Sequence, residues 1–314
     1  TTLISPGVLA LENDNSFVSQ QPVTVGASLI GPTVKGPVEI PTIVTSYSDY
    51  QNKFGTTFFS ASQVYTYFTS VAAFNYFANG GDTLLVSRVV SGSFTSATTS
   101  TGSVTAPNGG GVSILNSASL AECLVLKTIS QGTIMNSYGG TSSLDSSGAL
   151  IPSGSSDNIR WQITNQDTAQ GTFTLLVRQG NDNANTPIVL ETWTNLSMDP
   201  TAPNYVARVI GNQYKQYSNS DIQVVTYGEY PTNSKYVYVS SVLTPTPLYF
   251  DNNGLAKSTY TGSIPANASG SFTGSFLGLP TTTKVLPRTN LHFKSSFLIF
   301  SNINNVDFAF MSTS

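Results

Sequence analysis

Few residues in this sequence have the type and spacing that catalysis requires. His292 is the only histidine, which excludes a zinc cluster built from several histidines, and nothing around it marks the base of a catalytic triad. Gly26 and Gly31 have the glycine spacing of a phosphate loop, but Pro32-Thr33 stands where Lys-Ser or Lys-Thr is required. The sequence therefore predicts no nucleotide site, and we interpret His292 as a structural residue.

The acidic residues suggest no metal site or catalytic pair. The clusters Asn181-Asp182-Asn183 and Asp14-Asn15 lack the glycine and distal glutamate of a calcium loop, so we interpret them as turn residues. Among the 16 acids, no two are singled out as the pair of a glycosidase, although that alternative stays open. We expect no catalytic, cofactor-binding or metal-binding residue, no cofactor, and no enzymatic activity.

The composition narrows the range of partners. Charged residues make up 9% of the chain and the net charge is −3, so no basic surface is available for a nucleic-acid backbone and we expect no nucleic-acid partner. Uncharged polar residues must cover most of the surface, which favours dense self-association. No stretch approaches the length of apolar sequence that crosses a bilayer, so we expect no membrane insertion. Cys123 is the only cysteine, which excludes an intrachain disulfide and suits synthesis in a reducing cytoplasm.

The strongest secondary-structure pattern begins at Ser60. Ser60 and Gln63 have the spacing of a capping box, and apolar residues follow at the three-and-four spacing of a helix, which predicts a helix over 60–79. Its apolar face comprises Val64, Tyr67, Phe68, Val71, Phe74 and Ala78. We expect this face to be buried, with Phe68 and Phe74 in the core of the surrounding domain.

Two neighbouring patterns complete this α/β region. Gly80-Gly81 can end the helix, and the apolar run Leu84–Val90 predicts a buried strand, so we expect a helix packed on a sheet. Ahead of it, Ser46 or Ser48 is predicted to cap a short helix that ends at Gly55.

From Leu120 onward the pattern is mainly β. Further strands are expected at 122–129, 158–164, 172–178, 188–193, 222–226, 236–243 and 293–300. Asp199-Pro200 is predicted to open a helix that ends at Gly211. The expected fold class is α+β: a mixed α/β N-terminal core, with the helix packed on a sheet, and β-rich additional domains.

Composition shifts suggest five regions. These are an extended N-terminal arm (1–20), a mixed α/β region (21–95), a Ser/Thr/Gly-rich linker or insertion edge (96–119), a β-rich region with one helix that packs with the second region (120–215), and a loop-rich outer β domain (216–314). Within the last region, the many turn-forming residues between Asn252 and Thr283 predict a segment that is mobile or faces outward.

Several short motifs together resemble the N-terminal part of contractile phage tail sheath proteins. In order, they are Ser5-Pro6-Gly7-Val8, Gly31-Pro32, Lys35-Gly36-Pro37, Thr45-Ser46-Tyr47-Ser48-Asp49-Tyr50, Phe54-Gly55, Tyr76-Phe77-Ala78-Asn79-Gly80-Gly81 and Leu84-Leu85-Val86-Ser87-Arg88-Val89. Asn158-Ile159-Arg160-Trp161, Gly171-Thr172-Phe173, Val177-Arg178, Leu190-Glu191-Thr192-Trp193, Asp199-Pro200 and Asn204-Tyr205-Val206 resemble the region that follows in some sheath proteins. The resemblance covers residues 1–215 and rests on the shared order and spacing of the motifs.

This resemblance implies a structural role in a virion. Copies of a sheath protein form stacked, hexameric rings around a tail tube protein, bounded by baseplate and tail terminator proteins, and contract to drive the tube through the host envelope. The resemblance also implies assembly in the host cytoplasm and location in the virion tail. The long C-terminal α/β region of that family has no counterpart after Phe300. We therefore expect this chain to be a fragment or the ordered part of a longer protein. The alternative is a C-terminal half that is divergent or supplied separately.

The N-terminal arm carries an apolar set too small to form a core. Its members are Leu3, Ile4, Val8, Leu9 and Leu11. A frayed terminus is one interpretation; the other is a strand donated to the sheet of a neighbouring subunit, which the sheath resemblance favours because terminal arms join subunits in that family.

A β-rich adhesin or carbohydrate-binding module of a virion or secreted protein is the alternative function. Trp161 and Trp193 could form a sugar-stacking platform, but their position in alternating strands favours packing within the fold.

Overall fold

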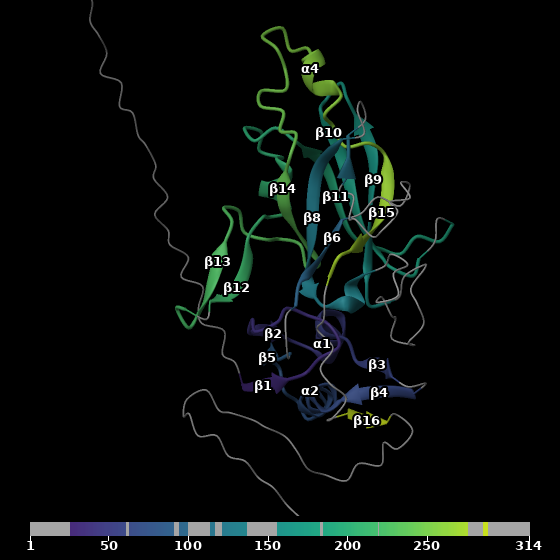
Figure 1. Cartoon of the computed structure of the whole chain (residues 1–314), viewed down its shortest axis with the longest axis vertical. Helices are drawn as coiled ribbons and strands as arrows, with labels where there is room; N and C mark the ends of the chain where they lie inside the picture. The colour runs from purple at the N-terminus through teal and green to yellow at the C-terminus, as the bar shows by residue number, and fades with distance from the viewer. Residues whose placement is uncertain are drawn as a thin grey trace, which may run out of the picture.

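Figure 1 shows the computed structural model of the chain, in which a large β-sheet stands above a smaller α/β body. The structure describes residues 26–60, 63–90, 94–99, 114–116, 121–136, 156–182, 185–218, 220–275 and 285–287. Strands dominate and helices are few, so the α+β fold class with β-rich parts is confirmed. The arm residues Leu3 to Leu11, His292 and the expected strand at 293–300 lie outside the described residues.

The α/β body is built on a three-stranded mixed sheet. β5 (Leu84–Arg88) lies in the middle, parallel to β1 (Ala27–Gly31) and antiparallel to β2 (Thr42–Val44). The helices α1 (Tyr47–Phe54) and α2 (Phe68–Ala78) pack with this sheet, and their buried side chains share one core with those of the strands. The expected packing of a helix on a sheet is therefore confirmed.

The start of α1 follows from local chemistry. The Ser46 side chain accepts a hydrogen bond from the backbone N–H of Asp49 at 3.1 Å, which satisfies one of the free amides at the helix N-terminus. Gly55 ends the helix at a φ of 70°, a backbone conformation that glycine adopts without strain. The predicted cap and end of this short helix are confirmed.

The predicted start of the longer helix is wrong. Thr57–Ser60 forms β3 and Gln63–Tyr67 forms β4, which pair as an antiparallel hairpin, so the helix begins only at Phe68. β16 (Val285–Pro287) pairs with the other edge of β4 and completes a second three-stranded sheet. Pairing with residues more than two hundred positions away in the sequence outweighs a capping-box spacing, which is a purely local signal.

The predicted buried face of this helix is wrong for Phe68, Phe74 and Ala78, whereas Tyr67, which ends β4, is buried as expected. Phe68 is 41% exposed and Phe74 is 45% exposed, whereas Ala72 and Ala73 are buried against the strands. Small side chains on the inner face allow the helix backbone to approach the sheet closely. The aromatic residues lie toward the outside, where Phe74 contacts Tyr47 edge to face with ring centroids 5.1 Å apart.

The large sheet has eight antiparallel strands. Its strands are β6 (Ser96–Thr99), β7 (Ile114–Leu115), β8 (Glu122–Gln131), β9 (Ile159–Asp167), β10 (Thr172–Gln179), β11 (Val189–Ser197), β14 (Val237–Val242) and β15 (Ala268–Thr273). Across the sheet they run in the order β11-β10-β9-β15-β6-β8-β14, with β7 also paired to β8. Its core includes Trp161, which is fully buried, so the expected packing role of this tryptophan is confirmed.

The sheet joins strands from regions that composition had separated. β6 and β7 come from 96–119, the expected linker, and β14 and β15 come from 216–314, the expected outer domain. β15 lies between β9 and β6, and its Phe272 is fully buried, so the expectation that 252–283 is mobile or outward-facing is wrong for this strand.

The remaining elements are short. β12 (Tyr214–Ser218) and β13 (Gln223–Tyr227) form a hairpin that stands beside the large sheet (Figure 1). The helical turns are η1 (Thr133–Met135), α3 (Val206–Val209) and α4 (Ser258–Thr261). The helix predicted over 199–211 is therefore reduced to the single turn α3, because the chain before Tyr205 forms turns stabilised by the Asp199 carboxylate.

Candidate functional site

Three of the sheath-like motifs, at residues 35–37, 54–55 and 84–89, are separated in sequence but meet in the α/β body. The motif at residues 5–8 lies outside the described residues. The backbone N–H of Lys35 donates to the carbonyl of Phe54 at 3.0 Å. Gly36 has a φ of 112°, and a Cβ at that position would lie 2.6 Å from the ring of Phe54. A Cβ at Gly55 would lie 2.9 Å from the Cβ of Val34. The glycines of two motifs are thus required by the close approach of these segments to one another.

A buried guanidinium joins this body to the large sheet. Arg88, at the end of β5, is fully buried and donates from Nη1 to the carbonyls of Gly36 at 2.8 Å and Gln131 at 2.7 Å. Its Nη2 donates to the carbonyl of Val34 at 3.4 Å. Burial lowers the pKa of Arg88 to about 10, while nearby Tyr67 and Tyr50 act in the opposite direction.

Two further residues strengthen the same junction. The backbone N–H of Gln131 donates to Gly36 at 3.1 Å, and the Gln131 side chain accepts from the backbone N–H of Val38 at 2.9 Å. Lys35 Nζ reaches the carbonyl of Asp157 at 3.1 Å and its carboxylate at 3.7 Å. Burial lowers the pKa of Lys35, and the Asp157 carboxylate partly offsets that effect. These contacts fix the orientation of the α/β body relative to β8 and to the chain before β9.

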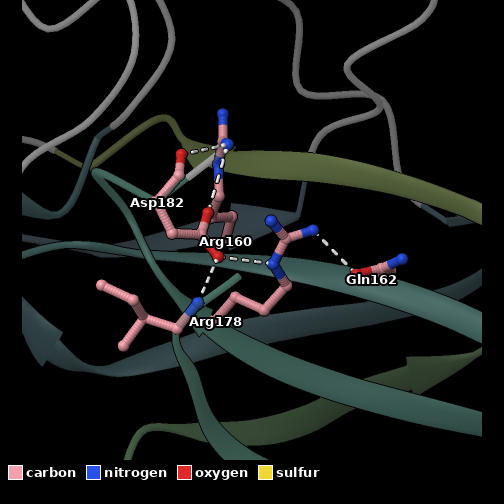
Figure 2. A network of polar contacts seen from close by, with 5 residues as sticks. Arg160, Gln162, Arg178 and Asp182 are labelled. Atoms are coloured by element: carbon pink, nitrogen blue, oxygen red, sulfur yellow. Dashed lines mark hydrogen bonds and ion pairs between the residues drawn. The ribbon is translucent and has the colours of Figure 1, made fainter. Parts of the chain in front are cut away.

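A second polar cluster lies on the sheet, where Arg160 and Arg178 occupy directly opposite positions of β9 and β10. Figure 2 shows both guanidinium groups beside Asp182, whose side chain is fully buried. The Asp182 carboxylate contacts Arg178 Nε at 2.6 Å and Arg160 Nη1 at 3.4 Å, and it accepts from the backbone N–H of Ile188 at 3.0 Å. Arg178 also donates to Gln162 at 2.7 Å. The carboxylate thus stabilises two like charges and the loop that follows β10.

A cleft of 1220 Å³ separates the α/β body, the large sheet and the β12–β13 hairpin. Residues of β6, β8 and β14 line it on the sheet side, including Lys127, Tyr238 and Ser240. Residues 37–43 and the α1 side chains of Asp49, Asn52 and Lys53 form one wall, and residues 213–217 of the hairpin form another. We refer to this space as the junction cleft.

A stack of three tyrosines holds the hairpin against the sheet. The ring of Tyr214 lies between those of Tyr227 and Tyr238, with both pairs of ring centroids 5.3 Å apart. Burial raises the pKa of Tyr238 to about 12, so its hydroxyl stays protonated at neutral pH. The hairpin wall of the junction cleft is therefore anchored by aromatic packing.

The motifs that could have indicated chemistry have structural roles instead. Most of the Gly26–Gly31 segment is strand β1, whose residues pair with β5, and it does not form a phosphate loop. Asp182 binds arginines and is more than the turn residue expected from its sequence context. Trp193 donates from Nε1 to Glu191 at 3.1 Å, within the sheet.

Within the described ranges, no three residues of the His, Cys, Asp and Glu types group as metal ligands would. No helix in those ranges has the length and hydropathy of a membrane span.

No protein-family model matches the sequence, and no curated protein matches it. Among solved structures, the chain is similar to a sheath tail protein from Listeria innocua, with 9% identity and a TM-score of 0.34 over 81% of this chain and 35% of that protein. It is also similar to a sheath tail protein from Desulfitobacterium hafniense, with 13% identity and a TM-score of 0.26 over 72% of this chain and 37% of that protein. The chain thus spans little more than a third of the length of these two proteins.

Proposed function

We propose that this chain belongs to a structural subunit of a contractile bacteriophage tail sheath. The observation that carries the proposal is the convergence of the sheath-like motifs in one body. Lys35 and Gly36 contact Phe54, and Arg88 donates to Gly36, so residues from three separate motifs depend on each other for their positions. A chance match of short motifs would not be expected to assemble into one interlocked unit.

In this role the subunit acts by assembly and not by catalysis. Copies polymerise in stacked hexameric rings around the tail tube, between the baseplate and the tail terminator, and contract to drive the tube through the host envelope. No nucleotide, metal or other cofactor takes part in this proposed activity. The α/β body carries the large sheet rigidly through the contacts of Arg88 and Gln131, so movement of one body would be transmitted to the other.

The N-terminal arm is proposed to link subunits. Its apolar set, Leu3, Ile4, Val8, Leu9 and Leu11, would join a neighbour by main-chain hydrogen bonds along a sheet edge and by alternate side chains in its core. The junction described above, by contrast, lies within one subunit.

Negative-stain microscopy of the complete protein tests the proposed function. We expect tubes or stacked rings at micromolar concentrations. A particle that remains a monomer or trimer and binds glycans would instead favour the carbohydrate-binding alternative. The full burial of Trp161 already removes one half of the aromatic platform on which that alternative depends.

A further inference from the structure

The junction cleft collects positive charge in a protein whose net charge is negative. The described residues include six lysines, and four of them line the cleft: Lys53, Lys127, Lys215 and Lys235. Two acids, Glu39 and Asp49, also line it. Asp49 contacts Lys53 at 2.8 Å, so this pair is internally neutral and an excess of positive charge remains.

The other three lysines come from different elements and are free to contact a ligand. Lys127 lies on β8 opposite Tyr238 of β14, Lys215 lies on the hairpin, and Lys235 lies in the loop before β14. Among the described residues, none of the three is within ion-pair distance of a carboxylate. Their separation around one concave space suits a ligand that carries more than one negative charge.

The shape of the cleft favours an extended polypeptide. Its volume of 1220 Å³ exceeds the roughly 300–1,000 Å³ typical of small-molecule sites. Tyrosine rings and hydroxyls lie among the lysines, which suits a segment with both apolar and acidic side chains. The edge strand β2 also faces this space, but Lys53 already donates to its Ile43 carbonyl at 2.9 Å. Recognition would therefore depend on side chains more than on addition of a strand to β2.

The chain itself contains a segment of the required charge. Glu12 and Asp14 are the most closely spaced acids in the sequence, and the first 25 residues contain no lysine or arginine. Apolar residues up to Leu11 precede these acids. The chain enters the fold at β1, and the cleft lies beside β2 at the opposite edge of the three-stranded sheet. In the proposed polymer, the same acidic segment of a neighbouring copy is available to this cleft.

We propose that the junction cleft binds the acidic stretch Glu12–Ser16 of a second copy of this chain. This inference rests on the proposed function, because a polymer supplies the second copy at high local concentration. In this proposal, the acidic part of the arm binds in the junction cleft, whereas the apolar part of the arm binds along a sheet edge.

A labelled peptide tests the assignment directly. Fluorescein-labelled peptide of residues 6–20 is titrated with the full chain at low salt, and binding is followed by fluorescence anisotropy. The double variant Lys215→Gln/Lys235→Gln should bind about fivefold more weakly, which corresponds to about 1 kcal/mol for the two exposed ion pairs together. A peptide carrying Glu12→Gln and Asp14→Asn should lose binding to a similar extent, and added salt should weaken the binding of the unmodified peptide.

A matched control removes two positive charges elsewhere. Lys257 and Arg208 lie outside the cleft, so Lys257→Gln/Arg208→Gln should bind the peptide as the parent does. Equal binding by both double variants, or no binding by the parent, overturns the proposal. Displacement of the peptide by inorganic phosphate at constant ionic strength would show a general anion site and overturn it also. If the chain binds the peptide only after Thr1–Ser16 has been deleted from it, the chain's own segment occupies the cleft, and the proposal that a second copy binds there is overturned.

This test can fail separately from the proposed function. Tubes formed by a complete protein that binds no peptide would remove the cleft assignment and leave the sheath role intact. A complete protein that binds the peptide but never forms rings or tubes would remove the sheath role while retaining the cleft as a binding site.

Discussion

Arg88 donates to the carbonyl of Gln131 at 2.7 Å, and this hydrogen bond joins the end of β5 to the end of β8. The same Arg88 nitrogen holds the Gly36 carbonyl at 2.8 Å, so one guanidinium connects a sheath-like motif of the α/β body to the large sheet. The relative placement of the two bodies thus depends on a charge that is buried among carbonyl oxygens.

Replacing Arg88 should weaken the fold without creating a buried charge. Arg88→Leu leaves the carbonyls of Gly36 and Gln131 without this donor, and we expect a loss of about 2–4 kcal/mol in the free energy of unfolding. Urea denaturation followed by circular dichroism measures it. Arg208 is exposed and lies over the Tyr230 ring at 5.3 Å, so Arg208→Leu should cost no more than about 1 kcal/mol. Equal effects of the two substitutions would contradict the proposed junction.

Asp182→Asn should destabilise the large sheet strongly. The substitution keeps the shape of the side chain but removes the charge between Arg160 and Arg178, which face each other on adjacent strands. Uncompensated buried charge typically costs about 3–5 kcal/mol, which thermal unfolding would detect as a large fall in the midpoint. Asp221→Asn, at the exposed tip of the hairpin, is the control and should leave the midpoint nearly unchanged.

Two phenylalanines of the α/β body should differ in their contribution to stability. Phe54 is fully buried, so Phe54→Ala should cost about 3–5 kcal/mol. Phe68 is 41% exposed, and Phe68→Ala should cost less than about 1.5 kcal/mol in the isolated chain. Chemical denaturation of the two variants under the same conditions provides the comparison, and a reversed order would contradict the observed orientation of α2.

The Cys123 thiol should react only when the protein unfolds. It is fully buried and donates to the Ile114 carbonyl, and burial raises its pKa from the ordinary 9.0 to about 12. The native state therefore keeps a proton that the unfolded state releases above pH 9. The stabilising contribution of this thiol is fully present below pH 9 and is lost as the pH rises toward 12.

Two measurements check this expectation. Thiol labelling at pH 8 should be slow for the native protein and rapid in denaturant. The difference in unfolding free energy between the parent and Cys123→Ala should decrease between pH 9 and 12; a constant or growing difference would show that burial does not hold the proton on the thiol.

Deletion of the N-terminal arm should separate folding from assembly. We expect the complete protein lacking Thr1–Ser16 to keep its thermal midpoint but to form no tubes, because the donated apolar residues Leu3 to Leu11 are lost. Calorimetry and negative-stain microscopy measure the two properties. If this variant forms normal tubes, the arm does not link subunits and is a frayed terminus.

Some elements were predictable because their causes are local. The Ser46 cap and the Gly55 end of α1 depend on residues within one helix, and the apolar run from Leu84 indicates a strand without reference to its partners. The expectations of no nucleic-acid partner and no intrachain disulfide likewise rest on composition alone, through the low charge and the single cysteine. The motif order suggested the proposed role before any contact between the motifs was known.

Tertiary structure decided the features that depend on distant partners. Ser60 and Gln63 satisfied a capping pattern, but pairing of β3, β4 and β16 placed them in strands. β6 and β15 consist largely of small and polar residues and lie in stretches that resembled loops. Both nevertheless lie inside the sheet, where neighbouring strands provide the backbone hydrogen bonds. The junction cleft could not be predicted from the sequence either. Its lysines are spread over 182 positions, from Lys53 to Lys235, and only folding brings them around one space. The sequence by itself determined the cap and end of α1, the strand β5 and the scarcity of charge, because these depend on composition or on neighbours in the chain. The strand order, the buried face of α2 and the position of every charge in the cleft depend on long-range pairing and packing, so only the tertiary structure decided them.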